Sequence, residues 1–244
     1  MNELILQKMK QMKLHGMSGA FKAALEDPTK INLTTDEFIS FLVEAEWDDR
    51  NNRRIERRIH SAKFRYKANV EQIDFKTDRN LDKNMMNRFA ECCYIDKNEN
   101  ILITGSTGIG KSYIASALGN QACMSGYKVL YASTSKLFAM LKMARADGSY
   151  IREIAKIEKA DLLILDDFGM QPLDSNNRSA LIEIIEDRHG RHSTIIAAQL
   201  PVGLWHDAIG DKTIADAVLD RIVHNAHRIE MTGESLRKKQ PLLN

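Results

Sequence analysis

Residues 105–112 read Gly105-Ser106-Thr107-Gly108-Ile109-Gly110-Lys111-Ser112 and match the phosphate-binding pattern G-x-x-x-x-G-K-[ST] at every fixed position. An apolar run over 101–104 predicts a strand that enters this motif, and residues 113–118 begin a predicted helix that leaves it. Glycines let the loop turn several backbone N–H groups toward one anion, and the helix start adds a partial positive charge. The segment from Gly105 to Tyr113 is therefore predicted to bind a nucleoside triphosphate. Lys111 is expected to reach the β- and γ-phosphates, and the Ser112 hydroxyl to coordinate Mg²⁺.

The composition is that of an ordinary globular protein. The 244 residues are 43% hydrophobic and 28% charged, and the net charge is only +2, so a polyanionic partner is expected only where basic residues gather locally. The three cysteines form no C-x-x-C pair, which favours reduced thiols over a disulfide or zinc framework. The early charges of the N-terminus argue against a signal peptide, and no apolar stretch approaches the roughly 20 residues that cross a membrane. We expect a soluble cytoplasmic protein without a membrane partner.

The pattern of predicted secondary structure changes near residue 95. Residues 1–68 read as helical throughout, whereas short apolar runs alternate with helical segments from about residue 95 onward, as in a parallel α/β sheet. Residues 69–95 are polar and read as a connection. The predicted fold is therefore α/β, with a five-stranded parallel P-loop NTPase sheet, helices on both faces, and a small all-helical N-terminal domain. The predicted domains are 1–68, for DNA or partner binding, and 69–244, for nucleotide binding and hydrolysis. The predicted strands are 101–104, 128–132, 162–166, 194–198 and 229–231.

A second motif ends the third predicted strand. The apolar run over 162–165 is followed by Asp166 and Asp167, the arrangement called Walker B. Asp166 is expected to hold Mg²⁺ through water and to help orient the phosphates. Asp167 suits a base that polarises the attacking water. The alternative for Asp167 is a solvated acid in a turn before Phe168 and Gly169.

Two further polar residues follow the pattern of such sites. Gln199 ends the fourth predicted strand, where its amide can hydrogen-bond the γ-phosphate or the lytic water, although glutamine at a strand end is often only a loop residue. Arg221 lies on an amphipathic helix near the C-terminus. An arginine from a neighbouring subunit can neutralise charge on the γ-phosphoryl group. The alternative for Arg221 is an ion pair with Asp220 or Asp216 on a solvated helix face.

Local positive charge is concentrated between residues 50 and 67, which contain eight basic residues and only one acid, Glu56. Five of them recur at helical spacing and form one stripe: Arg50, Arg53, Arg54, Arg57 and Arg58. Such a stripe is expected to follow the phosphate backbone of double-stranded DNA without reading its sequence. The alternative is salt bridging to the preceding acids, which are Glu44, Glu46, Asp48 and Asp49. Phe64 and Tyr66 are expected to pack rather than to stack on bases.

Together these segments resemble the IstB-like family, the ATP-binding helpers of insertion-sequence transposition, which belong to the AAA+ class and are close to DnaC-type helicase loaders. The likeness covers nearly the whole chain. It is carried by Leu14-His15-Gly16-Met17, the P-loop with Ala117-Leu118-Gly119, Leu162 to Gly169, Gln199-Leu200-Pro201-Val202 with Trp205-His206, Ala215 to His224, and Gly233 to Lys238.

The resemblance implies that the nucleotide is ATP and that Gln199 is the sensor-1 residue. It further implies that Arg221 is an arginine finger acting between subunits of a homo-oligomer, and that Arg237 is a sensor-2 residue touching the γ-phosphate. Asp167 stands where most AAA+ proteins carry Glu. The shorter side chain would hold water less closely, so slow hydrolysis that DNA or a partner stimulates is expected.

Four functions compete on these grounds. The leading one is an ATPase that oligomerises on target DNA with ATP, delivers the site to an IstA-like transposase, and hydrolyses ATP to disassemble. The alternative within the same class is a loader of a replicative helicase. A P-loop small-molecule kinase would need an acceptor pocket and an Arg-rich lid, and no insertion of suitable length follows the third strand. A nucleotide-binding scaffold without hydrolysis is the fourth, left open by Asp167.

Overall fold

The structure, a computed structural model, describes residues 2–26 and 33–236 of the chain. It divides into two compact units, Met1–Arg57 and Arg58–Asn244. This division falls earlier than the predicted boundary at 68, because Ala62 and Ala68 are buried in the core of the second unit. Among the described residues, no helix combines the length and apolar character that crossing a membrane requires.

Helices alone make up the described part of the first unit, as predicted. The Thr34 amide donates to Glu37 Oε2 over 2.7 Å, and the Glu37 amide donates back to Thr34 Oγ1 over 3.3 Å, which forms a capping box. The rings of Phe21 and Phe38 pack 6.2 Å apart and join two of the helices. The helices are α1 (Asn2–Gln11), α2 (His15–Glu26) and α3 (Thr35–Ala62), the last of which continues into the second unit.

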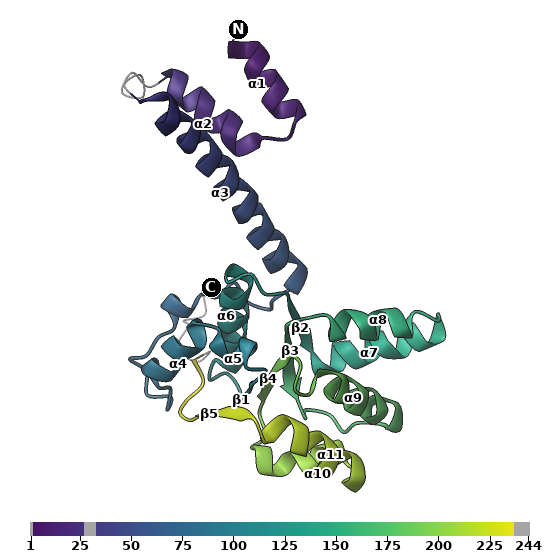
Figure 1. The fold of residues 1–244 in the computed structure, drawn as a ribbon. Coiled ribbons are helices and arrows are strands. Elements are labelled where there is room, and N and C mark those ends of the chain that lie inside the picture. The colour runs from purple at the N-terminus through teal and green to yellow at the C-terminus, as the bar shows by residue number, and fades with distance from the viewer. Residues whose placement is uncertain (1, 27–32, 237–244) are drawn as a thin grey trace, which may run out of the picture. The chain divides into compact units, whose positions relative to one another are not determined.

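The second unit is built on a parallel sheet in the order β2-β3-β4-β1-β5 (Figure 1). Each predicted strand is confirmed, and the largest difference in bounds is at β5, which begins at Ala226 rather than at 229. The order has a consequence for the site, because it places β4 directly between β3 and β1. The strands are β1 (Asn100–Gly105), β2 (Val129–Ser133), β3 (Leu162–Phe168), β4 (Ser193–Ala198) and β5 (Ala226–Met231).

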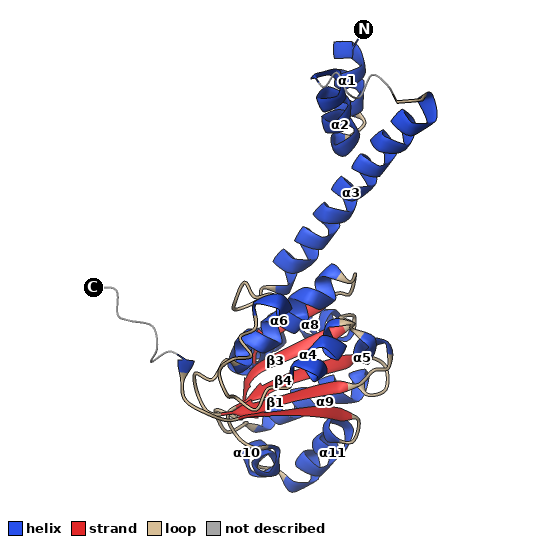
Figure 2. Ribbon diagram, turned by 90° about the vertical axis from the view of Figure 1, so that its left-hand side faces the viewer, coloured by secondary structure: helices blue, strands red, loops and turns tan. Residues whose placement is uncertain are grey.

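Helices cover both faces of this sheet, and alternation along the strands decides which side chains face which layer. Ile101 and Ile103 of β1 join the cluster with α6, while Leu102 between them joins the opposite cluster. Figure 2 shows α6 on one side of the sheet and α10 and α11 on the other. The first layer holds η2 (Val70–Gln72), α4 (Lys83–Ala90), α5 (Cys93–Asp96) and α6 (Lys111–Met124). The second holds α7 (Thr134–Ala146), α8 (Tyr150–Glu158), α9 (Ser175–Arg188), η3 (Val202–Leu204), α10 (Trp205–Ile209) and α11 (Lys212–Val223).

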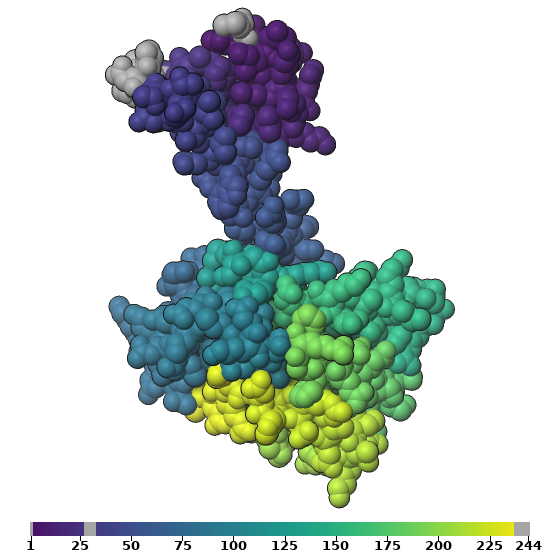
Figure 3. Space-filling view, viewed as in Figure 1, coloured from purple at the N-terminus to yellow at the C-terminus, as the bar shows by residue number. Residues whose placement is uncertain are grey.

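The segment 69–95 contributes more than the polar connection that its sequence indicates. Met86 and Phe89 of α4 are buried in the core beside α6. Asn80 Nδ2 donates to the carbonyl of Glu230 over 2.8 Å, which joins this segment to β5. In Figure 3 the blue surface of this segment lies beside the yellow surface of β5. Its apolar residues are too widely spaced along a polar stretch to show this burial in the sequence.

Candidate nucleotide-binding site

The P-loop turns between the end of β1 at Gly105 and the start of α6 at Lys111. Gly108 takes φ 82°, a conformation that favours glycine, and a Cβ there would lie 2.1 Å from Ser235 Oγ. The Leu236 amide donates to the Gly108 carbonyl over 3.0 Å, so the segment after β5 braces the outside of the loop. The predicted strand, glycine loop and helix are therefore all present in the arrangement that an anion site requires.

Lys111 lies against the loop that it is predicted to serve. Its Nζ donates to the carbonyl oxygens of Gly105 over 2.7 Å and Ser106 over 2.8 Å, and the residue is only 8% exposed. These bonds hold the ammonium group at the loop, where it is available to the β- and γ-phosphates. Tyr113, in the first turn of α6, packs its ring 6.2 Å from that of Tyr66.

Asp166 is the most tightly bound carboxylate of the site and is 1% exposed. Its Oδ1 accepts bonds from Ser112 Oγ and from the Asp167 amide, both over 2.9 Å. Its Oδ2 accepts a bond from the Tyr131 hydroxyl and one from Arg65 Nη1 over 3.3 Å. Burial, followed by the bond to Asp166, raises the pKa of Tyr131, so its phenol stays protonated and acts as a donor.

Ser112 and Asp166 offer what a hard divalent cation needs. Both present oxygen atoms, and Ser112 Oγ lies 2.9 Å from Asp166 Oδ1. The described residues contain no cluster of three or more His, Cys, Asp or Glu side chains that could hold a metal ion. Mg²⁺ is usually held by one or two protein oxygens together with substrate phosphates and water, so Ser112 and Asp166 fit Mg²⁺ that is bound jointly with nucleotide phosphates.

Asp167 follows Asp166 with an unusual backbone, φ 56°, within the irregularity where the pairing of β3 with β4 shifts register between Leu165 and Phe168. Its side chain is 31% exposed, and its Oδ2 lies 2.9 Å from Arg65 Nη1. Asp167 thus stands beside Asp166 at the site with one charged partner, rather than being solvated alone in a turn.

Arg65 is a residue of this site that sequence reasoning missed, since it counted only as one of eight basic residues. Burial disfavours the charged form of its guanidinium, whereas the neighbouring Asp167, Tyr66 and Asp166 favour that form, and the pKa of Arg65 is raised. No local pattern pairs residue 65 with residues 166 and 167.

Gln199 directly follows β4 and lies beside the P-loop. Its Oε1 accepts a bond from Thr107 Oγ1 over 2.7 Å, and its Nε2 contacts Met170 Sδ at 3.4 Å. Because β4 lies between β1 and β3, Gln199 emerges between the P-loop and the Walker B acids. That is the position from which an amide can reach a γ-phosphate or a lytic water.

Arg79 is a second residue that sequence reasoning missed. It is 4% exposed, and its Nη1 donates to the carbonyl of Ile109 over 3.2 Å, while its Nη2 donates to the Asp74 carbonyl. A Cβ on Gly110 would lie 2.9 Å from this Nη1. A buried guanidinium therefore supports the P-loop from the outside and adds positive charge next to an anion site.

Arg221 lies near the N-terminal ends of the parallel strands, whereas these residues lie at the C-terminal ends. The neighbouring Ile222 carbonyl accepts a bond from Asn100 Nδ2 over 3.2 Å. Asn100 begins β1 and Gly105 ends it, so the strand places about 17 Å between its N-terminal end and the P-loop. Arg221 Nη2 pairs with Glu186 Oε1 of α9 at 3.1 Å, rather than with Asp220 or Asp216. Arg237 lies outside the described residues.

The IstB-like ATP binding protein family matches residues 7–243. The chain belongs to this family. A protein of Sinorhizobium fredii, whose name assigns it to an insertion sequence and to ATP binding, is 44% identical over 235 residues, 96% of each chain. Membership confirms the predicted resemblance and identifies the P-loop as that of an ATP-binding protein linked to insertion sequences.

Solved structures show the same fold as this IstB-like chain. DnaI has a TM-score of 0.59 at 23% identity, covering 68% of this chain and 92% of that one. The DnaC helicase loader has a TM-score of 0.55 at 18% identity, covering 68% and 97%. The second unit therefore has the predicted fold, a five-stranded parallel P-loop sheet with helices on both faces.

The arginine stripe of the IstB-like chain lies on α3, and two of its members are paired. Arg50 Nε lies 2.7 Å from Glu46 Oε1, one turn earlier. Arg53 Nη2 lies 2.7 Å from Asp49 Oδ2. The predicted alternative of local salt bridges is thus present for these two. The other members are Arg54 and Arg57, which are exposed, and Arg58, which is partly buried.

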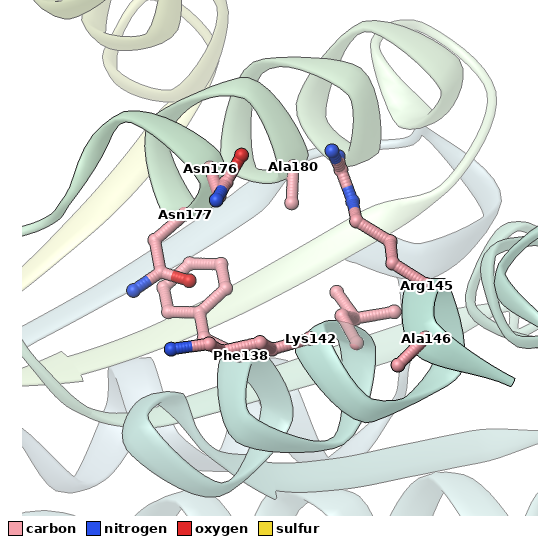
Figure 4. A pocket seen from close by; sticks show the side chains of 8 residues that line it. Phe138, Lys142, Arg145, Ala146, Asn176, Asn177 and Ala180 are labelled. Atoms are coloured by element: carbon pink, nitrogen blue, oxygen red, sulfur yellow. The ribbon is translucent and has the colours of Figure 1, made fainter.

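A separate surface pocket lies between α7 and α9 (Figure 4). Phe138 and Ala180 contribute apolar surface, while Arg145 of α7 and Asn177 of α9 contribute polar groups. No predicted site residue lines it. The nucleotide site and this pocket are therefore distinct features of the domain.

Proposed function

We propose that this IstB-like protein is an ATPase that assembles on double-stranded DNA as a homo-oligomer when it binds ATP with Mg²⁺. The observation that carries the proposal is the placement of Arg221. Lys111, Asp166 and Gln199 meet at the C-terminal ends of the strands. Arg221 lies near the N-terminal ends of the strands in the same domain. An arginine finger so placed can reach only the nucleotide of a second copy.

In this proposal ATP acts mainly as an assembly signal. Binding draws Arg221 of one subunit onto the phosphates of the next, and hydrolysis releases the contact. Asp167 is the proposed base. Its short side chain, held by Arg65, supports slow hydrolysis that DNA or a partner protein accelerates.

The assembled protein would deliver its DNA site to a transposase. The name of the relative from Sinorhizobium fredii, which refers to an insertion sequence, supports this partner. The likeness to the DnaC helicase loader, at 18% identity, concerns the fold. The alternative function is loading of a replicative helicase. A pull-down with purified transposase and with purified helicase distinguishes the two functions.

Mass and DNA binding measured together test assembly. With ATP or a non-hydrolysable analogue we expect a large increase in mass and tight binding to a duplex of about 50 base pairs. With ADP or without nucleotide we expect smaller species and weak binding, because the Arg221 contact needs the γ-phosphate. Analytical ultracentrifugation and fluorescence anisotropy measure the two quantities. A chain that stays unassociated and indifferent to duplexes with every nucleotide contradicts the proposal.

The exposed members of the arginine stripe are proposed to bind DNA phosphates. We expect Arg54→Ala with Arg57→Ala to weaken DNA binding. The negative slope of log affinity against log salt should become shallower by about 2, one unit per lost contact. The paired Arg50 and Arg53 should contribute less, since their charges are already partly neutralised.

A matched control removes two exposed positive charges elsewhere in the first unit, through Lys10→Ala with Lys13→Ala. We expect this double variant to keep the wild-type salt slope. The stripe is not the DNA contact if both double variants behave alike.

A further inference from the structure

One guanidinium nitrogen joins the two Walker B acids. Arg65 Nη1 lies 2.9 Å from Asp167 Oδ2 and 3.3 Å from Asp166 Oδ2. The two carboxylates are adjacent in sequence and repel each other, and Arg65 supplies a positive charge between them. This bridge spans about 100 residues of chain and lies wholly within the second unit.

The residues on either side of Arg65 hold it in this place. Phe64 packs its ring 6.1 Å from that of Tyr131, the same residue that donates to Asp166. Phe64 also passes so close to α6 that a Cβ on Gly119 would lie 2.5 Å from its ring. On the other side, Tyr66 packs 6.2 Å from Tyr113 of α6. Arg65 is therefore anchored on both sides, although its own side chain is 41% exposed.

The bridge occupies only one of the two carboxylate oxygens of Asp166. Arg65 and Tyr131 both donate to Oδ2, whereas Oδ1 accepts bonds from the Ser112 hydroxyl and the Asp167 amide. A cation at the Ser112 side would not have to displace Arg65. It would nevertheless feel the repulsion of the guanidinium, because both lie next to the same carboxylate.

We propose that Arg65 is a positioning residue of the nucleotide site, whose guanidinium clamps Asp167 beside Asp166 and whose charge sets the Mg²⁺ requirement. The part that concerns hydrolysis rests on the proposed ATPase function. The clamp fixes the carboxylate that would polarise the attacking water. The charge compensates the two acids before Mg²⁺ arrives and thereby weakens the binding of the ion.

The test compares Arg65→Ala, Arg65→Gln and Arg65→Lys with the control Lys67→Ala, which removes an exposed charge from the same segment. The first readout is the Mg²⁺ concentration that half-saturates binding of a non-hydrolysable fluorescent ATP analogue. We expect this concentration to fall about threefold or more in Arg65→Ala and Arg65→Gln, since a neighbouring cation is lost. Arg65→Lys, which keeps the charge, and Lys67→Ala should stay near wild type.

The second readout is steady-state hydrolysis. We expect kcat to fall about tenfold in Arg65→Ala, while KM for ATP changes less than about twofold, because Arg65 holds Asp167 and not the nucleotide. Thermal melting of each variant checks that the domain remains folded, and Arg65→Gln provides a near-isosteric side chain if Arg65→Ala is unstable.

An unchanged or increased Mg²⁺ requirement in both uncharged variants overturns the proposal, as does a kcat equal to or above wild type. A control that shifts as much as Arg65→Ala also overturns it. Should the wild-type protein not hydrolyse ATP at all, the proposed ATPase function fails. The Mg²⁺ titration with the analogue still decides the role of Arg65 in that case.

Discussion

Replacement of Lys111 by alanine is expected to raise the Kd for ATP about 100-fold. The substitution removes the charged donor that lies over the P-loop and leaves the carbonyl oxygens of Gly105 and Ser106 facing the site. A charge-assisted contact to two phosphates contributes about 2 to 3 kcal/mol, which corresponds to a loss of this size. Isothermal titration with ATP and Mg²⁺ measures it.

Lys156→Ala is the matched control, since Lys156 is an exposed lysine of the same domain that pairs with Glu153 at 2.6 Å. It should bind ATP as the wild type does. If Lys111→Ala binds ATP within a few-fold of the wild type, the P-loop does not hold the phosphates as the geometry implies. The assembly and DNA binding that depend on ATP should be lost together with nucleotide affinity.

Arg221→Ala is expected to keep ATP affinity and to lose hydrolysis by about 1,000-fold, the magnitude typical of an arginine finger. The affinity should remain because Arg221 lies across the sheet from the P-loop of its own subunit. Glu186→Gln is a companion variant. It removes the ion pair that holds the Arg221 side chain against α9, and it keeps the arginine. This variant should hydrolyse ATP at least as well as the wild type.

Mixing two inactive variants shows whether Arg221 acts between subunits. Arg221→Ala retains a working P-loop, and Lys111→Ala retains a working arginine. In mixed oligomers some interfaces unite the intact P-loop of the first with the intact arginine of the second. We expect partial recovery of hydrolysis in a DNA-stimulated phosphate-release assay. Absence of recovery, in mixtures shown by mass to co-assemble, would exclude a role in trans.

The features that the sequence predicted correctly depend on local patterns. The glycine loop and its flanking strand and helix each arise from residues within a few positions of one another. Apolar runs of strand length revealed all five strands. Asp166 and Gln199 could be assigned to the site because the ends of parallel strands meet at one edge of a sheet.

Other features escaped prediction because their partners are distant in sequence. Arg65 was counted only as one of the eight basic residues between 50 and 67, yet it contacts Asp166 and Asp167. Arg79 lies in a segment that reads as a polar connection, yet it is buried against the P-loop. The alternative considered for Arg221 was an ion pair with Asp220 or Asp216 on its own helix, whereas the observed partner is Glu186 of α9.

The sequence by itself determined that N-terminal helices precede a parallel α/β domain with a P-loop, because local backbone conformation and the spacing of apolar residues are set by neighbouring residues. Only the tertiary structure decided which charges meet. The strand order β2-β3-β4-β1-β5 brings Gln199 between the P-loop and the Walker B acids. The packing of the helix that carries Arg221 puts this residue near the opposite ends of the strands. The packing of Phe64 and Tyr66 on the domain delivers Arg65 to Asp167. Coulomb interactions depend on distance in space, and that distance exists only once the core has formed.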